Sequence, residues 1–370
     1  MHILFLTWKD IHHPNAGGAE RIMYEYACRL VRRWHTVTWF ASAFRWGERE
    51  TYIEGIHVIR RYTVNTLWMF AWLWYLSFRR KNPVDIIIDE AGGWPNMTPL
   101  FVKKDRLFFF VHHIGDGEFR EHPWIIGQWA RCIYRLLFRF YRHVRCITIS
   151  RSTRDELTAS FWYREENITI IENTTEITPI ERIDFSVKTH DFLFLWRLTP
   201  IKRPDHAIRA FASIRTSLPP DAHLHIIGKH QDTSYSVSLH ALVKSLDIVD
   251  RVIFHGFLEH DAFLALMDTS RAILVPSEKE WYGLIVLEAN AHGLPAIAYD
   301  VPGLRDSVKP WVNGVLIRDH DIEGVWRAMQ DMIENEEKYR ILSESSLEYR
   351  KHLPTWDDLT DRLEKLITQK

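Results

Sequence analysis

Short runs of β-branched and aromatic residues alternate with longer amphipathic stretches along the whole chain, and this pattern limits the possible folds most strongly. The run from Leu107 to Val111, LFFFV, contains no polar residue. A strand that is apolar on both faces is typical of a parallel sheet covered by helices on both sides. The sequence therefore predicts an α/β fold built from successive βα units.

The alternation is interrupted once and then resumes, which indicates two domains. A polar stretch from Asn173 to His190 separates two series of predicted strands. The chain has 370 residues, of which 46% are hydrophobic, enough for two ordinary cores. The predicted strands span residues 2–7, 36–41, 57–60, 85–89, 107–111, 145–149 and 168–171 in the first series, and 191–196, 224–227, 251–255, 272–275, 296–299 and 314–317 in the second.

We therefore predict a Rossmann-like domain over residues 1–182, a second doubly wound domain over 183–353, and a last helical segment over 354–370. Ligands of open parallel sheets bind beyond the carboxyl ends of the strands. Two such sheets in tandem are expected to face each other across a cleft. Residues that directly follow strands are the first candidates for a functional site.

The most specific candidate is the segment from Val275 to Pro295, which reads VPSEKEWYGLIVLEANAHGLP. A helix is expected from Leu284, and Gly283 before it permits close backbone approach. Backbone N–H groups at a helix start favour an anion such as a diphosphate. Glu280 precedes the helix and can reach a sugar, whereas Glu288 can accept hydrogen bonds from a vicinal diol. Alone, the two glutamates are equally well explained as a loop carboxylate and a helix-surface charge.

Two cations follow the first strand of the second series. In FLFLWRLTPIKRPDHAIRAF, the strand leads to Arg197 and a short loop leads to Lys202 ahead of a helix. Cations opposite a diphosphate neutralise the charge that grows on a leaving group. The alternative is a pair of solvated surface charges.

The first half of the chain has two candidates of its own. Gly17 and Gly18 lie in a loop between a strand and a helix, where glycine lets the backbone approach a phosphate closely. The Gly-x-Gly-x-x-Gly fingerprint of dinucleotide sites is absent, and a plain turn is the alternative. His112 and His113 directly follow a predicted strand, although a histidine is more often structural than catalytic.

In their order and spacing, these motifs resemble those of the family-four retaining glycosyltransferases with the GT-B fold, the glycosyl transferases group 1. Glu280 and Glu288 match the Glu-x7-Glu motif of that family, and Arg197 and Lys202 have its Arg and Lys spacing. The loop at Gly17–Glu20 resembles its Gly-Gly-Ala-Glu loop. The resemblance covers essentially the whole chain. It fails where the family has glycines and this chain has Trp196, His230 and Thr174.

The resemblance implies a first domain that binds the acceptor, a second that binds the nucleotide-sugar donor, and a C-terminal helix that crosses back to the first. It implies catalytic roles for Glu280, Arg197, Lys202 and His112, with His112 beside the anomeric centre of the sugar. The implied donor-binding residues are Gly17, Gly18, Gly228, Gly256, Phe257, Leu258, Trp281, Tyr282, Gly283, Leu284 and Glu288, and the implied acceptor-binding residues are His113 and Ser150.

We therefore expect a hexosyltransferase that moves a sugar, with retention of configuration, from a nucleotide diphosphate sugar to a hydroxyl acceptor such as a lipid-linked or cell-envelope glycan. The family works without a bound metal, and no Asp-x-Asp motif follows a strand, so no metal and no other cofactor is expected. Two alternatives stay open. One is a phosphorylase or nucleotide-sugar synthase on the same fold, and the other is a non-catalytic partner subunit that binds a nucleotide sugar.

The charged residues are divided unevenly between the two halves. Residues 1–150 carry 21 basic and 13 acidic side chains, whereas the remainder carries 26 and 35. A basic half suits an anionic partner such as a phospholipid surface or a lipid-phosphate acceptor. No nucleic-acid motif accompanies it, so nucleic acid is not an expected partner.

Two segments of the basic half are candidates for a lipid surface. A basic amphipathic helix, which can lie on anionic lipid, is predicted over residues 124–145. Leu67 to Leu76 is apolar and rich in tryptophan but too short to span a bilayer, so it is either a buried helix or one that dips into the interface. The predicted helix has Ile133, Leu136, Leu137, Phe140 and Val144 on one side and Arg131, Arg135, Arg139, Arg142 and Arg145 on the other.

The sequence also indicates in which cellular compartment the protein is expected. No apolar run approaches twenty residues, and the first residues, MHILFLTW, lack the charged start of a secretory signal. The three cysteines have no spacing that suggests disulfides. We expect a cytoplasmic protein, with peripheral association with the inner face of the membrane as a hypothesis.

Overall fold

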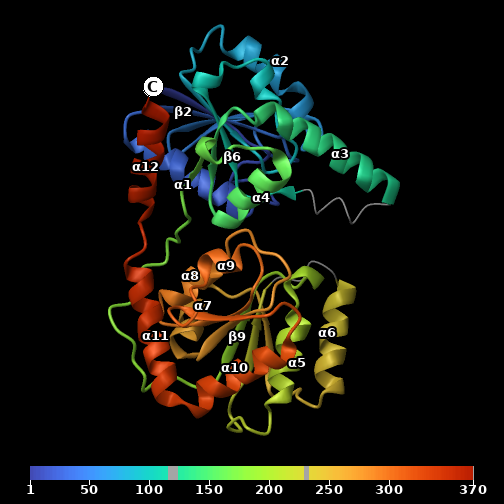
Figure 1. Cartoon of the computed structure of the whole chain (residues 1–370), viewed down its shortest axis with the longest axis vertical. Helices are drawn as coiled ribbons and strands as arrows, with labels where there is room; N and C mark the ends of the chain where they lie inside the picture. The colour runs from blue at the N-terminus through green and yellow to red at the C-terminus, as the bar shows by residue number, and fades with distance from the viewer. Residues whose placement is uncertain (116–123, 229–232, 370) are drawn as a thin grey trace. The chain divides into compact units, whose positions relative to one another are not determined.

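The structure, a computed structural model, describes residues 1–115, 124–228 and 233–369. It consists of two compact units, one made of Met1–Asn173 and Pro354–Lys370 and the other of Thr174–Leu353. Each unit is a mainly or fully parallel sheet with helices packed around it (Figure 1). The change of unit between Asn173 and Thr174 comes earlier than the predicted boundary after residue 182.

The first unit contains an eight-stranded sheet in the order β3-β4-β2-β1-β5-β6-β7-β8. Its strands are β1 (His2–Leu6), β2 (Thr36–Ala41), β3 (Glu50–Ile53), β4 (Ile56–Arg60), β5 (Ile86–Glu90), β6 (Leu107–Val111), β7 (Arg145–Thr148) and β8 (Ile168–Ile170). All adjacent pairs are parallel except β3 and β4. The helices are α1 (Gly18–Arg32), α2 (Leu67–Phe78), α3 (Trp124–Tyr141), α4 (Arg151–Phe161) and α12 (Trp356–Thr368), with short turns η1 (Thr98–Leu100), η2 (Lys104–Arg106) and η4 (Glu165–Asn167).

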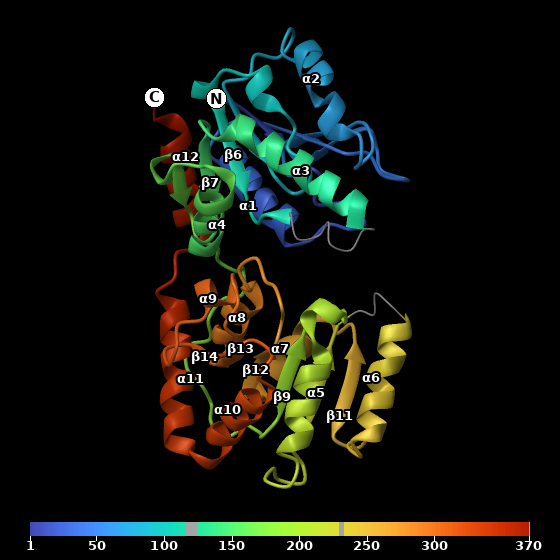
Figure 2. The same ribbon diagram turned by 45° about the vertical axis from the view of Figure 1, so that its right-hand side comes forward.

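The second unit contains a fully parallel six-stranded sheet in the order β11-β10-β9-β12-β13-β14. Its strands are β9 (Phe192–Leu195), β10 (Leu224–Ile227), β11 (Val252–Gly256), β12 (Ala272–Val275), β13 (Ala296–Tyr299) and β14 (Gly314–Ile317). The helices are α5 (Pro204–Ser213), α6 (Thr233–Ser245), α7 (His260–Thr269), α8 (Leu284–Asn290), α9 (Leu304–Ser307), α10 (Ile322–Glu334) and α11 (Glu336–Lys351), and η5 (Pro200–Lys202) precedes α5. Figure 2 shows α5 and α6 side by side against this sheet.

These sheets confirm the predicted α/β class, and their strand order locates the ligand-binding edge. Every residue of β6 and of β12 is buried, as the continuous apolar runs predicted. In each sheet the order of strands reverses beside the first strand, between β1 and β5 in one unit and between β9 and β12 in the other. Ligands of doubly wound folds bind beyond the carboxyl ends of the strands at such a point.

The polar stretch predicted as a linker lies against the second unit. The guanidinium of Arg350 donates to the carbonyls of Thr175 and Ile177, and the Ile180 N–H donates to the carbonyl of Ala291. The ammonium of Lys188 donates to two further carbonyls. Hydrogen bonds between this segment and the second unit, made by backbone groups of the segment and by the Lys188 side chain, hold it in place. The apolar content of the sequence does not reveal such bonds.

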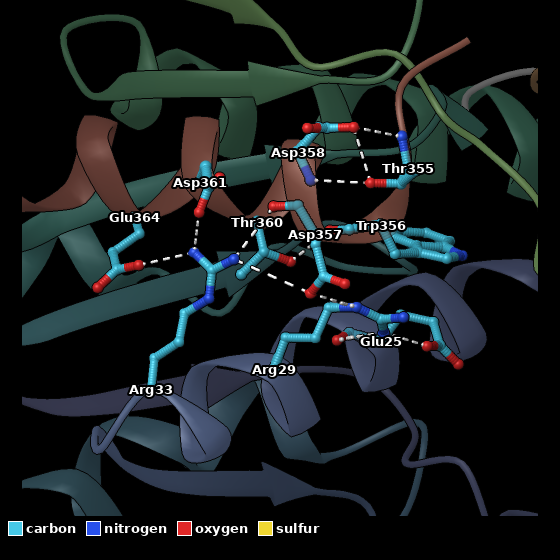
Figure 3. A network of polar contacts seen from close by, with 10 residues as sticks. All are labelled: Glu25, Arg29, Arg33, Thr355, Trp356, Asp357, Asp358, Thr360, Asp361 and Glu364. Atoms are coloured by element: carbon cyan, nitrogen blue, oxygen red, sulfur yellow. Dashed lines mark hydrogen bonds and ion pairs between the residues drawn. The ribbon is translucent and has the colours of Figure 1, made fainter. Parts of the chain in front are cut away.

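The final helix, α12, belongs to the first unit and packs on α1 (Figure 3). The ring of Trp356 meets that of Tyr26 edge to face at 5.5 Å and is almost fully buried. Arg33 of the segment after α1 pairs with Glu364 at 2.8 Å and also with Asp361. Thr355 caps the helix by accepting from the N–H of Asp358. An apolar anchor with charged pairs around it thus holds the end of the chain.

The helix predicted over residues 124–145 is shorter in the structure, and the side that it buries differs from the predicted apolar side. In α3 the buried side consists of Tyr134, Leu137, Phe138 and Tyr141, and the rings of Phe138 and Tyr141 contact Phe109 of β6. The helix ends at Tyr141, and Arg145 begins β7. Its apolar residues surround most of the helix, so their spacing does not specify which side meets the sheet. The exposed large apolar residues are Trp124, Ile125, Ile126, Trp129, Ile133, Leu136 and Phe140.

The tryptophan-rich helix α2 is buried on one side and exposed on another. Leu67, Ala71 and Tyr75 are buried, whereas one side carries the exposed residues Met69, Phe70, Trp72 and Leu73. Trp94 connects α2 to α3, since its ring stacks on Trp68 and meets Tyr134 edge to face. Among the described residues, no helix is long and apolar enough to cross a membrane.

Candidate active site

A buried ion pair between Lys202 and Glu280 lies beyond the carboxyl ends of β9 and β12. Nζ of Lys202 is 2.6 Å from Oε1 of Glu280, and both side chains are more than nine-tenths buried. Ser277 Oγ donates to the same Oε1 at 2.9 Å. Burial lowers the pKa of Lys202, the charge of Glu280 opposes this shift, and Arg197 adds to it. The fold thus brings together two predicted catalytic residues from distant parts of the chain.

Arg197 lies beside this pair but remains in solvent. Its side chain is exposed, and it forms no ion pair within the part of the chain that the structure describes. Trp196, which replaces the family's glycine, places its ring 4.5 Å from Nζ of Lys202. A fixed buried ammonium next to an exposed guanidinium suits an anion with several oxygens, such as a diphosphate.

The turn that carries Glu280 depends on Gly303, for which the sequence analysis predicts no role. A Cβ at residue 303 would lie 2.2 Å from the carbonyl oxygen of Glu280, and φ of Gly303 is +86°. Only glycine fits there. Ser277 was also missed, because a serine after a strand is common and its bond to Glu280 exists only in the folded chain.

Glu288 lies on α8 and is partly buried. Burial raises its pKa to about 7, although a hydrogen bond with Thr175 opposes the shift. Of the neighbouring predicted residues, Trp281 is exposed, Tyr282 is buried, Gly283 has φ of +76°, and Leu284 starts the helix.

The loops after β9, β10 and β11 meet backbone to backbone. The N–H of Gly228 donates to the carbonyl of Gly256 at 2.8 Å, and a Cβ on Gly228 would lie 1.8 Å from the carbonyl oxygen of Trp196. Phe257 is exposed, whereas Leu258 packs against the core. His230 lies outside the described residues.

In the first unit, the glycine loop leaves open space. Gly17 is the N-cap of α1 and its N–H donates to Oε2 of Glu20 at 2.7 Å. A Cβ on Gly18 would meet no atom within 4 Å. The fold itself therefore does not require glycine at residue 18, which leaves an approaching ligand as a reason for it.

The predicted residues after β6 and β7 have different surroundings. His112 is fully buried, burial lowers its pKa to about 3, and its carbonyl oxygen is 3.5 Å from Oγ1 of Thr153. His113 is also buried. Ser150 caps α4, since its Oγ accepts from the N–H of Thr153 at 3.1 Å. Ser150 thus has a structural role, and its contact with an acceptor stays a prediction.

Among the described residues, no group of three or more His, Cys, Asp or Glu side chains is arranged to hold a metal ion. At the ligand edge of the second sheet, Lys202, Glu280 and Ser277 form a polar cluster, with Arg197 beside it. This set can bind and polarise an anionic group.

Comparison with known proteins identifies relatives of the whole chain. The family model described as Glycosyl transferases group 1 matches residues 179–348, and that described as Glycosyltransferase Family 4 matches residues 16–178. An uncharacterized glycosyltransferase of Methanocaldococcus jannaschii is 24% identical over 339 residues, which cover 86% of this chain and 85% of that protein.

Two solved structures show the same fold. Sucrose-phosphate synthase from Thermosynechococcus elongatus has a TM-score of 0.79 at 18% identity and covers 99% of this chain and 98% of its own. HepE from Anabaena, solved in complex with UDP and glucose, has a TM-score of 0.74 at 18% identity, with 100% and 99% covered. The two family models adjoin and together span most of the sequence, so the chain belongs to the group 1, GT4-type family of glycosyltransferases with the GT-B fold.

Proposed function

We propose that this protein is a retaining glycosyltransferase that transfers a sugar from a nucleotide diphosphate sugar to a hydroxyl acceptor, such as a lipid-linked or cell-envelope glycan. The observation that carries the proposal is the buried Lys202–Glu280 pair beside the exposed Arg197, at the strand-order reversal of the second sheet. The UDP and glucose bound to the Anabaena relative support a nucleotide sugar as donor.

In the proposed reaction, Arg197 and Lys202 bind the diphosphate and stabilise the charge that develops as it leaves. Glu280 keeps Lys202 in place and can also accept a hydrogen bond from the sugar, while Glu288 binds the ribose diol. The acceptor hydroxyl attacks the anomeric carbon from the side of the leaving group. The new C–O bond replaces the bond to the diphosphate, and the hydroxyl proton passes to the departing phosphate oxygen. Charge stabilisation of this kind typically contributes a hundredfold to a thousandfold in rate.

The donor is tested first by thermal shift. Uridine, guanosine and adenosine diphosphate sugars are compared, because a ligand at a hundred times its Kd stabilises the folded chain by about 2.7 kcal/mol. Release of nucleoside diphosphate is then measured with and without acceptor, and the anomeric configuration of the product is determined by NMR. A chain that binds the donor but never releases diphosphate would be a non-catalytic subunit. A requirement for free phosphate or free sugar would indicate a phosphorylase or synthase.

We also propose that the reaction needs no metal, since the two cations hold the leaving diphosphate. The expected result is an unchanged rate of diphosphate release after treatment with EDTA. A rate that falls with EDTA and returns with Mg²⁺ or Mn²⁺ would contradict this.

We propose further that the first unit docks on the cytoplasmic surface of an anionic membrane. The exposed apolar residues of α2 and α3 listed above form what we term the apolar face, and Trp124 and Trp129 on it are 77% and 68% exposed. Basic residues accompany it, among them the exposed Arg139 on α3 and Arg79 at the end of α2. Apolar side chains flanked by cations suit the interface of anionic lipid.

Flotation with vesicles of phosphatidylglycerol and phosphatidylcholine tests the docking. The wild-type chain is expected to float with the vesicles, and less so at high salt. A variant with Trp124→Ser and Trp129→Ser should stay at the bottom, whereas Trp34→Ser, which changes a tryptophan that is 95% exposed on another element, should float normally. Equal flotation of the double variant and the wild type would contradict the assignment of this face.

A further inference from the structure

Two adjacent acidic residues, Asp89 and Glu90, end β5 at the strand-order reversal of the first sheet. Their carboxyl groups differ in how many hydrogen bonds they accept. Asp89 accepts from Asn96 Nδ2 at 2.8 Å and from the hydroxyls of Tyr141 and Thr98. Glu90 is 4% exposed, and its Oε2 accepts only a long bond from the N–H of Trp8 at 3.3 Å. Oε1 of Glu90 has no hydrogen-bond partner among the residues described.

The neighbouring strand, β6, brings a second unsatisfied group to the same place. Nε2 of His112 lies 3.8 Å from Oε1 of Glu90, too far for a direct hydrogen bond. Both ring nitrogens of His112 are buried, and within the described ranges neither has a partner. Buried polar groups in native proteins are nearly always hydrogen-bonded, so such an exception calls for a water or a ligand.

The protonation states of Glu90 and His112 indicate what kind of ligand fits. Burial, aided by the charges of Glu20 and Asp89 and opposed by the Trp8 N–H and Lys9, raises the pKa of Glu90 to about 8. Burial lowers the pKa of His112 to about 3. Both groups are therefore mainly uncharged at neutral pH, and each presents one donor and one acceptor. A hydroxyl, which also donates and accepts, matches them, whereas a phosphate would need cations.

Gly92 fixes where the Glu90 carboxyl lies. A Cβ on Gly92 would lie 2.4 Å from Oε1 of Glu90, so the absence of a side chain at residue 92 allows the carboxyl to take its position. Lys9, the nearest cation on the loop after β1, is occupied by Glu20 at 3.5 Å and by the carbonyl of Asn15. Glu90 and His112 thus form a buried pair at the ligand edge of the unit, with hydrogen-bonding atoms that no described residue satisfies.

We infer that Glu90 and His112 together bind a hydroxyl of a sugar-class acceptor, with Glu90 as a positioning residue that the sequence motifs do not reveal. This inference rests on the proposed function, because it assigns the substrate whose hydroxyl is glycosylated. Glu90 contributes a hydrogen bond that orients the acceptor, and the departing diphosphate still takes the proton.

Direct binding is tested without donor, so that the result does not depend on catalysis. The full chain carries ¹⁵N-labelled histidine, and the probes are the methyl α-pyranosides of glucose, mannose and galactose at high concentration. At least one of them should shift the ring nitrogen signals of His112, assigned with a His112→Gln variant. The shift should weaken in Glu90→Leu, which keeps size but no hydrogen-bonding group. No shift with any pyranoside would overturn the inference and leave donor binding by the second unit untouched.

Kinetics then separate an acceptor contact from other roles. With the pyranoside that shifts His112 as acceptor, Glu90→Leu should raise its KM about tenfold, the usual effect of one hydrogen bond, with donor KM and donor hydrolysis by water unchanged. Glu90→Gln, which retains a donor and an acceptor, should restore most of the affinity. The matched control is Asp89→Asn. Because the Asp89 carboxylate is already hydrogen-bonded by the protein, this variant should be less stable but have an unchanged KM for the acceptor.

Three other outcomes would overturn the inference. A rise in donor KM alone would place the contact on the donor sugar. If Glu90→Leu lowered kcat and abolished a dependence of kcat on pH with a midpoint near 8, Glu90 would be a proton acceptor. Identical KM and kcat values for Glu90→Leu and the wild type would mean that Glu90 and His112 bind only an ordered water. If the wild type released no diphosphate from any donor, the proposed function would fail instead.

Discussion

Lys202 and Glu280 are buried together, so each depends on the other for the stability of its charge. Removing one member of a buried pair leaves an uncompensated charge and typically costs 3–5 kcal/mol, whereas replacing both can be nearly neutral. Stability and catalysis therefore respond differently to changes at these two residues.

We predict that Lys202→Met lowers the free energy of unfolding by about 3–5 kcal/mol and slows diphosphate release a hundredfold or more. The double variant with Lys202→Met and Glu280→Gln should recover much of the stability but none of the rate. Urea unfolding and turnover measured on the same samples check this. Recovery of the rate in the double variant would show that Lys202 acts only in folding.

The raised pKa of Glu90 predicts how stability depends on pH. Its unfolded value is that of an ordinary glutamate, near 4.5, and its folded value is about 8, so the folded chain binds the proton more tightly. Relative to Glu90→Gln, the free energy of unfolding of the wild type should fall as pH rises from about 4.5 to about 8 and stay level above that. Urea unfolding of both chains at about pH 5, 7 and 9 measures the difference. A constant difference across this range would mean that Glu90 is not held in its neutral form.

At the scale of elements, apolar and charged interactions contribute differently to the stability of the contact between α12 and α1 (Figure 3). Trp356 is 5% exposed and packs on Tyr26, whereas Asp361, which pairs with Arg33, is largely in solvent. Exposed ion pairs contribute at most about 1 kcal/mol, but removing a buried tryptophan costs about 3–5 kcal/mol.

Trp356→Ala should therefore release α12 while Asp361→Ala leaves it in place. Hydrogen exchange of the α12 amides provides the measurement, with the amides of β6 as an internal reference. Faster exchange along α12 in the aspartate variant would show that the charged pairs, rather than the tryptophan, anchor the helix.

The elements also differ in how well the sequence predicted them. Strands such as β6 and β12 were predicted at their observed bounds, because a run of four or five apolar residues is long enough for a strand but short for a helix. The edge strand β3, with the short sequence ETYI, was missed because its alternating, half-exposed residues resemble a loop. The buried side of α3 could not be predicted, because apolar residues extend well beyond the part of the helix that contacts Phe109 of the sheet.

At the scale of the whole molecule, the division into two units gives a prediction for ligand binding. The proposed donor site uses the loops after β9 and β12 of the second unit. A nucleoside diphosphate selected by the thermal-shift panel should therefore slow hydrogen exchange at residues 196–203 and 277–284. Amides of α12 should not respond. Protection spread evenly over both units would indicate a general stabilisation rather than this site.

The amino-acid sequence alone determined the α/β class, the two-sheet organisation and the family, since these depend on local apolar runs and on motifs that are contiguous in the chain. It also identified Lys202 and Glu280 as separate candidates. Only the tertiary structure showed that the two are paired, that Gly303 allows their turn, and that Oε1 of Glu90 is buried beside His112 with no hydrogen-bond partner among the described residues. Pairing, close approach and unsatisfied burial are relations between residues distant in the sequence, and they come into existence when the chain folds.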